Sequence, residues 1–156
     1  MIAGAAALLI FSVRSGFCHR RPRSAGQRRR SRLAAQSIAW IYAPGREPHG
    51  QDDSLDVHAA GTRGVTADGV AMLERLTIAS PPIDGVALRY GHLYGPGTGA
   101  AAAEIASLHV DATALAALLA IEKAGRRIYN IAEPSRYLST EKARRELGFR
   151  LTASLA

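Results

Sequence analysis

The sequence predicts an α/β fold in which a parallel sheet is flanked by helices. Residues Leu33–Tyr42 and Val86–Tyr90 are rich in small and apolar side chains, which is typical of strands covered on both faces. Between them, Thr66–Ser80 repeats apolar residues with a period near 3.6, which indicates a helix. A strand, a helix and a second strand in this order form a parallel crossover in nearly all known cases.

The stretch Leu88–Gly97, LRYGHLYGPG, ends a strand in an abrupt turn. Gly95 and Gly97 leave this turn without side chains, and Pro96 between them is stiff. In open α/β sheets, ligands bind beyond the carboxyl ends of the strands. The turn is therefore a candidate ligand site, although a plain strand and turn would have the same residue types.

Four further elements follow the turn. They are a short strand at Leu108–Val110, a helix from Asp111 to Lys123, a strand at Arg127–Ala132 and a helix from Ser139 or Thr140 to Leu147. Side chains of the Asp, Ser and Thr type cap helices, and Thr66 or Asp68 would cap the first helix in the same way. The predicted order is thus strand, helix, strand, strand, helix, strand, helix.

Residues 1–32 differ from the rest of the chain in charge. Eight of the 20 basic residues lie between Arg14 and Arg32, whereas 12 basic residues face 13 acidic ones from Leu33 onward. We expect residues 1–32 to be a disordered basic leader, residues 33–150 to form the domain and residues 151–156 to be a tail. A targeting role for the leader is an alternative. Its arginines lack interleaved aromatic residues, so we do not expect a nucleic-acid partner.

Two further features bear on the compartment. The apolar run Ala3–Val13 has 11 residues, fewer than the roughly 18 to 20 that cross a bilayer. Cys18 is the single cysteine, which excludes an intrachain disulfide. We therefore expect a cytoplasmic protein that does not span a membrane.

The segment Arg46–Gly64 is predicted to be a long polar surface loop. The loop has carboxylate and imidazole side chains, which are possible metal ligands: Asp52, Asp53, Asp56, His49 and His58. Their spacing matches no fixed ligand pattern, and a surface loop carries solvated charges in any case. We therefore predict no metal site.

Five motifs in succession resemble the extended short-chain dehydrogenase/reductases, the NAD-dependent epimerase/dehydratase family. They are LAAQSIAWIY, LRYGHLYGPGT, HVDATALAALLAIE, IYNIAEP and STEKARRELGF. The resemblance covers residues 33–150 and corresponds to the carboxyl-terminal half of the family. It implies a partial Rossmann-type sheet, NAD or NADP as cofactor, and a small-molecule substrate such as a sugar-nucleotide or carbonyl compound. It is also compatible with a homo-oligomer.

Two departures from the family pattern limit this prediction. The sequence has no strand, glycine-rich turn and helix of the kind that receives the cofactor's pyrophosphate, so the amino-terminal nucleotide-binding half is missing. The family's catalytic Tyr and Lys positions align with Thr66 and Val70, and neither can transfer a proton in their place. We expect an oxidoreductase- or epimerase-like chain that is truncated or atypical and inactive alone. The alternative is a non-catalytic fragment or binding module.

The resemblance also suggests site residues. Ser37 lies near the family's Ser/Thr position and is a catalytic candidate, although a Ser in a buried strand more often bonds backbone. His92 is a candidate acid or base, with a structural role as the alternative. Strand alternation would place Tyr90, His92 and Tyr94 on one face. The cofactor-binding candidates are Tyr90, Gly91, Tyr94, Gly95 and Pro96.

Overall fold

The computed structural model describes residues 10–13, 31–100 and 105–151. Its main sheet has four strands in the order β1, β2, β3, β6. Their bounds are β1 (Ile10–Val13), β2 (Arg32–Ile38), β3 (Asp84–Tyr90) and β6 (Arg127–Ile131). β2, β3 and β6 are parallel, and β1 is antiparallel to β2. A separate parallel pair consists of β4 (His92–Tyr94) and β5 (Ser107–His109).

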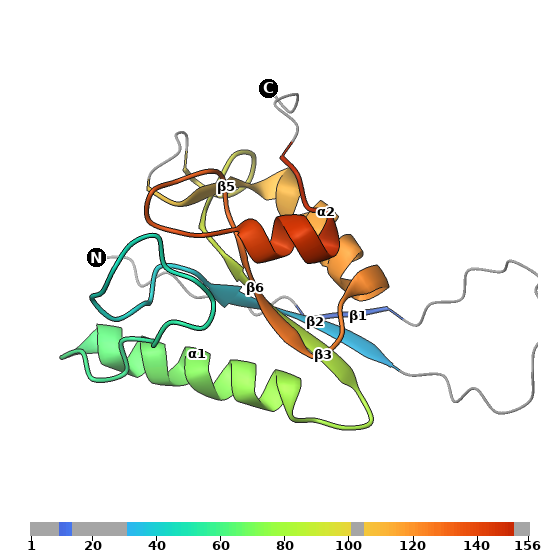
Figure 1. Ribbon diagram of the computed structural model, residues 1–156, viewed down its shortest axis with the longest axis horizontal. Helices are drawn as coiled ribbons and strands as arrows, with labels where there is room; N and C mark the ends of the chain where they lie inside the picture. Colours follow the sequence, from blue (N-terminus) through green and yellow to red (C-terminus); the bar gives the residue numbers. More distant parts are fainter. Residues whose placement is uncertain (1–9, 14–30, 101–104, 152–156) are drawn as a thin grey trace, which may run out of the picture.

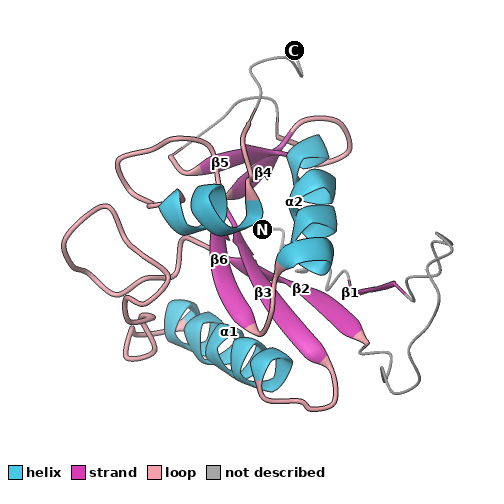
Figure 2. Ribbon diagram, turned by 45° about the vertical axis from the view of Figure 1, so that its right-hand side comes forward, coloured by secondary structure: helices cyan, strands magenta, loops and turns pink. Residues whose placement is uncertain are grey.

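Helices cover both faces of the main sheet (Figures 1 and 2). Helix α1 (Thr62–Ile78) lies on one face and α2 (Val110–Lys123) on the other. Adjacent residues of β3 show this arrangement, because Arg89 binds Glu74 of α1 whereas Tyr90 bonds the Thr113 carbonyl of α2. The predicted α/β class, a parallel sheet with flanking helices, is confirmed.

The main apolar core lies between the sheet and α2. Buried alanines recur every four residues along α2, at Ala112, Ala116 and Ala120, so one narrow stripe of the helix faces the sheet. The short π-type helix η1 (Ala143–Leu147) closes this core with Leu147 and ends at Gly148, whose φ of 70° suits glycine. Among the described residues, no helix has both the length and the apolar character needed to cross a bilayer.

The structure corrects the predicted helix starts. α1 begins at Thr62 with Gly61 as its N-cap, instead of at Thr66 or Asp68. Arg63 accounts for the earlier start, because its guanidinium donates to the Trp40 and Tyr42 carbonyls and fixes the first turn. α2 is capped by the His109 side chain, which accepts from the Asp111 amide, instead of by the Asp111 side chain.

Part of the predicted leader belongs to the sheet. Ile10–Val13 forms β1 and Arg32 begins β2, so the expectation of disorder for residues 1–32 is wrong at these positions. The physical reason is backbone pairing, because β1 completes the hydrogen bonds of the outer edge of β2. The rest of the leader and residues 152–156 of the tail lie outside the described residues.

Candidate functional site

The candidate site lies at the carboxyl edge of the parallel strands. β2, β3 and β6 end at Ile38, Tyr90 and Ile131, and these three residues are neighbours across the sheet. The chain then enters the segments that begin at Ala39, Gly91 and Ala132. Because parallel strands share their carboxyl edge, these segments meet where open α/β sheets bind ligands.

A group of buried polar side chains, here called the buried network, lies beneath this edge on the α1 side. Its members are Ser37, Tyr42, Glu74, Arg89 and Asn130. Arg89 and Glu74 form a two-point ion pair, with Nε–Oε1 2.7 Å and Nη2–Oε2 2.6 Å, and both side chains are about 95% buried. Ser37 Oγ donates to Glu74 Oε1 at 2.7 Å.

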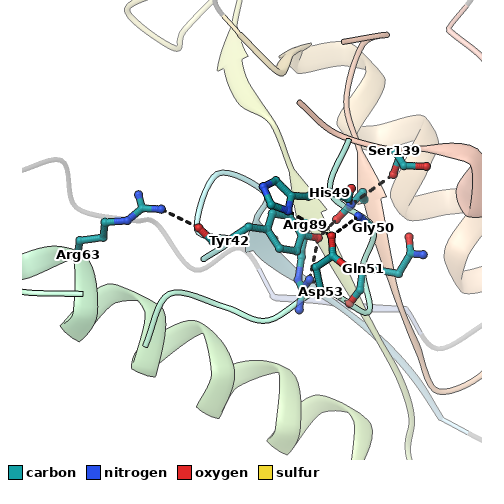
Figure 3. Close-up of polar contacts among 9 residues, drawn as sticks. Tyr42, His49, Gly50, Gln51, Asp53, Arg63, Arg89 and Ser139 are labelled. Carbon is teal, nitrogen blue, oxygen red and sulfur yellow. Dashed lines mark hydrogen bonds and ion pairs between the residues drawn. The ribbon is translucent and has the colours of Figure 1, made fainter. Parts of the chain in front are cut away.

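Hydrogen bonds carry the network across the sheet to β6 (Figure 3). Arg89 Nη1 donates to Tyr42 Oη at 2.8 Å, and Tyr42 Oη donates to Asn130 Oδ1 at 2.6 Å. Asn130 Nδ2 contacts the carbonyls of His49 and Ser139, which joins the long loop to the segment after β6. The network therefore holds together the loops that surround the edge.

Burial and contacts within the network shift the pKa values of Arg89 and Tyr42. Burial alone would lower the pKa of Arg89, but the hydrogen bonds and negative charge of Glu74 outweigh it and raise that pKa. Burial raises the pKa of Tyr42, although Arg89 opposes the shift. Arg89 is thus a permanent cation and Tyr42 a neutral hydrogen-bonding partner.

The Ser37 hydroxyl is bonded within the buried network. It is 3% exposed, and its hydroxyl bonds the Glu74 carboxylate instead of backbone, so the backbone alternative is wrong. The bond exists because Ser37 and Arg89 face each other in register across β2 and β3. A catalytic role for Ser37 stays a prediction, and its hydroxyl would have to leave Glu74 to reach a substrate.

The positions aligned with the family's Tyr and Lys lie on α1. Thr66 is exposed, and its hydroxyl donates to the Thr62 carbonyl at 2.8 Å. Val70 is 8% exposed and belongs to an apolar cluster with Ile41 and Ala67. Of the two aligned positions, one is therefore an exposed hydroxyl bonded to its own helix and the other is part of an apolar cluster.

In the loop Arg46–Gly64, possible metal ligands bond or stack with other protein groups. His49 is buried, stacks on Tyr42 at 4.9 Å and lies 3.2 Å from Asp53 (Figure 3). Asp56 pairs with Arg63 at 2.6 Å. Within residues 31–100 and 105–151, no three His, Cys, Asp or Glu side chains gather in a way that could hold a metal ion.

An aromatic pair marks the exposed part of the edge. Trp40, just beyond β2, stacks on His92 at the start of β4, with ring centroids 5.0 Å apart and planes 10° apart. Trp40 packs against the Ile41, Ala67 and Val70 cluster, whereas His92 is exposed. The sequence analysis missed Trp40. Its position directly after a strand was the available signal, but the contact with His92 is long-range.

Tyr94 and Glu133 stand next to this pair. Tyr94 Oη donates to Glu133 Oε1 at 2.6 Å, and this bond is the main cause that raises the pKa of Tyr94. His92 and Tyr94 are two residues apart on β4 and so share a face. We call Trp40, His92, Tyr94 and Glu133 the edge site.

The expected common face of Tyr90, His92 and Tyr94 is wrong. The chain leaves the main sheet at Gly91, so Tyr90 belongs to β3 and the other two to β4. Tyr90 is buried, its hydroxyl bonds the Thr113 carbonyl, and burial raises its pKa. At Gly91, a Cβ atom would lie 1.9 Å from the Ala106 oxygen, which explains why glycine stands there.

The predicted cofactor residues therefore fall into two groups. Tyr90 and Gly91 are buried in packing contacts, whereas Tyr94 of the edge site and the following Gly95 and Pro96 are partly or fully exposed. A cofactor-binding role for these residues stays a prediction. Among the described residues, no glycine-rich turn leads directly from a strand into a helix, which is the arrangement that cradles a pyrophosphate.

Comparisons with known proteins support the same fold. No family model matches the chain. Over 80 residues, it is 48% identical to a 3-diazoavenalumate denitrifying reductase from Streptomyces, a match that covers 49% of this chain and 25% of the reductase. The solved UDP-glucose 4-epimerase from Thermotoga maritima, crystallised with UDP-glucose, has a TM-score of 0.61 at 18% identity over 80% of this chain and 59% of its own.

A second solved structure, MoeE5 in complex with UDP-glucose and NAD, has a TM-score of 0.60 at 17% identity, covering 80% of this chain and 60% of MoeE5. The chain thus spans about 60% of these structures and a quarter of the reductase. The resemblance to the epimerase/dehydratase family is confirmed at the level of the fold. The matches include a named reductase and a named epimerase, and the MoeE5 structure contains NAD.

Proposed function

We propose that this chain forms the substrate side of a nicotinamide-dependent reductase. The observation that carries the proposal is that the two residues which the resemblance aligns with the family's Tyr and Lys, Thr66 and Val70, have no side chain that can relay a proton. Val70 lies in an apolar cluster against which Trp40 packs, and Thr66 bonds its own helix. The 48% identity with a reductase over 80 residues favours the same activity.

The missing relay argues for reduction over epimerisation. Epimerisation at a carbon that carries a hydroxyl requires a base that removes the hydroxyl proton and later returns it. Thr66 and Val70 cannot do this, and Ser37 is bonded to Glu74. His92 is the exposed side chain of the edge site that could move a proton, and its catalytic role stays a prediction.

Some reductions require no proton from the protein. A diazonium group on carbon accepts a hydride, the carbon–nitrogen bond breaks, and the group departs as N2. The hydride cancels the positive charge, so the products are a neutral C–H compound and N2, and no proton is exchanged. A bound reduced nicotinamide would supply the hydride. The name of the reductase relative, which denitrifies a diazo compound, makes this the substrate chemistry we favour.

A non-catalytic binding module is the second candidate. The observation that favours it is the lack of a glycine-rich pyrophosphate cradle among the described residues. In that case the edge site would bind a small molecule without any cofactor.

Thermal-shift titrations of the purified chain separate the two candidates. We expect saturable stabilisation by NADH or NADPH and a much smaller effect of ADP, because the proposed contacts Tyr94, Gly95 and Pro96 would meet the nicotinamide end, which ADP lacks. Stabilisation by ADP equal to that by NADH would contradict this placement. No shift at millimolar concentration of either dinucleotide would overturn the reductase proposal and leave the binding module. UDP-glucose serves as the matched test of a sugar-nucleotide substrate, for which we expect no shift.

A further inference from the structure

The stacked pair of the edge site has one anchored side and one open side. Trp40 packs against the Ile41, Ala67 and Val70 cluster, which fixes its ring. The His92 ring stacks on the Trp40 ring, with 5.0 Å between the ring centroids and 10° between the ring planes, and His92 is exposed. A flat ring can therefore extend the stack at His92 without displacing core residues.

A carboxylate bonds Tyr94, which shares a face of β4 with His92. Glu133 accepts the Tyr94 hydroxyl at 2.6 Å, and its backbone amide donates to the Ser107 carbonyl at 2.8 Å. Ser107 is the register partner of His92 in the β4–β5 pair, so the Glu133 backbone lies on the far side of β5 from His92, and the Glu133 carboxylate reaches β4 through the Tyr94 hydroxyl. Within the part of the chain that the structure describes, no Lys or Arg forms an ion pair with Glu133.

The loop that follows Trp40 has more acidic than basic residues. Between residues 43 and 61 there are four acidic residues and a single basic one, Arg46. Arg63, which reaches the carbonyl of Trp40, is already paired with Asp56 at 2.6 Å. With the Asp56 charge balanced by Arg63, the loop keeps a small excess of negative over positive charge.

We propose that the edge site binds a flat aromatic cation, stacked on the Trp40–His92 pair and held by the charge of Glu133. The ring electrons of Tyr94 attract cations, and stacking on His92 selects planar groups. An arenediazonium ion is a ligand of this class that a hydride can reduce, so the inference rests on the proposed function for its substrate class. The binding site itself is testable without any cofactor.

Trp40 is the single tryptophan of the chain, so its fluorescence reports directly on this site. Three probes separate planarity from charge: 1-methylquinolinium is a flat cation, 2-naphthoate a flat anion and tetramethylammonium a cation without a ring. We expect saturable quenching by 1-methylquinolinium, with Kd values at least about tenfold higher for the other two. Quenching that rises linearly with concentration, as it does for free N-acetyltryptophanamide, would be collisional and would overturn the inference.

Variants test the two parts of the site separately. Glu133→Gln keeps an acceptor for Tyr94 but removes the charge, and we expect the Kd for 1-methylquinolinium to rise about three- to tenfold. His92→Ala should have a similar effect, whereas His92→Phe, which retains a flat ring, should bind nearly as well as the wild type. His58→Ala, an exposed loop histidine, is the matched control and should change nothing.

Each result has a distinct meaning, provided that the melting temperatures of the variants show that they fold. Equal affinity for 2-naphthoate and 1-methylquinolinium, or no effect of Glu133→Gln, would overturn the cation preference. Unchanged binding in His92→Ala would overturn the stacking site. A dinucleotide shift without quinolinium binding would contradict this inference alone, and quinolinium binding without a dinucleotide shift would contradict the reductase proposal alone.

Discussion

The buried network and the edge site lie within a few residues of each other along the same strands, but they differ in where their polar groups find partners. Ser37, Glu74 and Arg89 bond one another and are at least 95% buried. His92 and Glu133 lie where solvent or a ligand can reach them. Polar residues at the end of a strand can therefore be structural on one side of the edge and available for binding on the other.

Breaking the ion pair of the buried network should have the largest effect. Arg89→Met leaves the Glu74 carboxylate buried without its cation, and we expect a loss of about 3–5 kcal/mol in the free energy of unfolding. Urea denaturation measures this loss. The double variant Glu74→Leu, Arg89→Met removes both charges and should recover much of it. Arg126→Met, which breaks the more exposed pair with Asp84, is the control and should cost at most about 1 kcal/mol.

The turn from the main sheet to the edge site should be the next most sensitive point. In Gly91→Ala, the new Cβ would meet the Ala106 oxygen at 1.9 Å, so backbone must move, at a cost of about 2–3 kcal/mol. Gly125→Ala is the control, because nothing lies within 4 Å of a Cβ there. A Gly91→Ala variant as stable as the wild type would show that the backbone around Gly91 has room for a side chain. Gly91 would then again be a candidate for contact with a cofactor.

Ser37 could belong only to the buried network or also to the ligand site, and these two roles predict different results. Ser37→Ala removes the hydrogen bond to Glu74 but leaves the bond from Arg89, so we expect a loss of about 1–2 kcal/mol in the free energy of unfolding. Binding of 1-methylquinolinium at the edge site should not change. Weaker binding with unchanged stability would reverse the assignment and place Ser37 in the ligand site.

Local patterns in the sequence account for the elements but not for the contacts between them. The strands around Ala35, Leu88 and Tyr129 follow from composition, and the helices follow from periodicity and stop signals. The network bonds join residues far apart in the chain, for example Ser37 to Glu74 across 37 positions and Tyr42 to Asn130 across 88. No periodicity encodes such pairs.

The edge site was predictable only in part for the same reason. His92 and Tyr94 followed from their place after a strand, but their partners did not. Trp40 and Glu133 reach them from two other strand ends, and the switch of sheets at Gly91 broke the alternation on which the predicted faces depended. The pairing of β1 with β2 escaped prediction because the apolar residues of the leader gave no sign of a partner strand.

The smallest expected effect is a loss of stability in alkaline solution, and it again separates buried from exposed groups. Burial, followed by the hydrogen bond to Glu146, raises the pKa of Tyr129 to about 12, against roughly 10 in an unfolded chain. Between these values the unfolded chain has released the proton and the folded chain has kept it. The contribution of Tyr129 is therefore complete below pH 10 and is lost as the pH rises from 10 to 12.

Urea denaturation at pH 8, 10 and 11 measures this loss, and the variant Tyr129→Phe should show a flatter decline than the wild type because its ring has no proton to release. Tyr94→Phe at the edge site is the matched control. Its hydroxyl also bonds a carboxylate, Glu133, but solvent screens the interaction, so the alkaline decline should stay close to that of the wild type. If Tyr94→Phe flattened the decline more than Tyr129→Phe, the edge site would be the better shielded of the two regions, and its availability to a ligand would be contradicted.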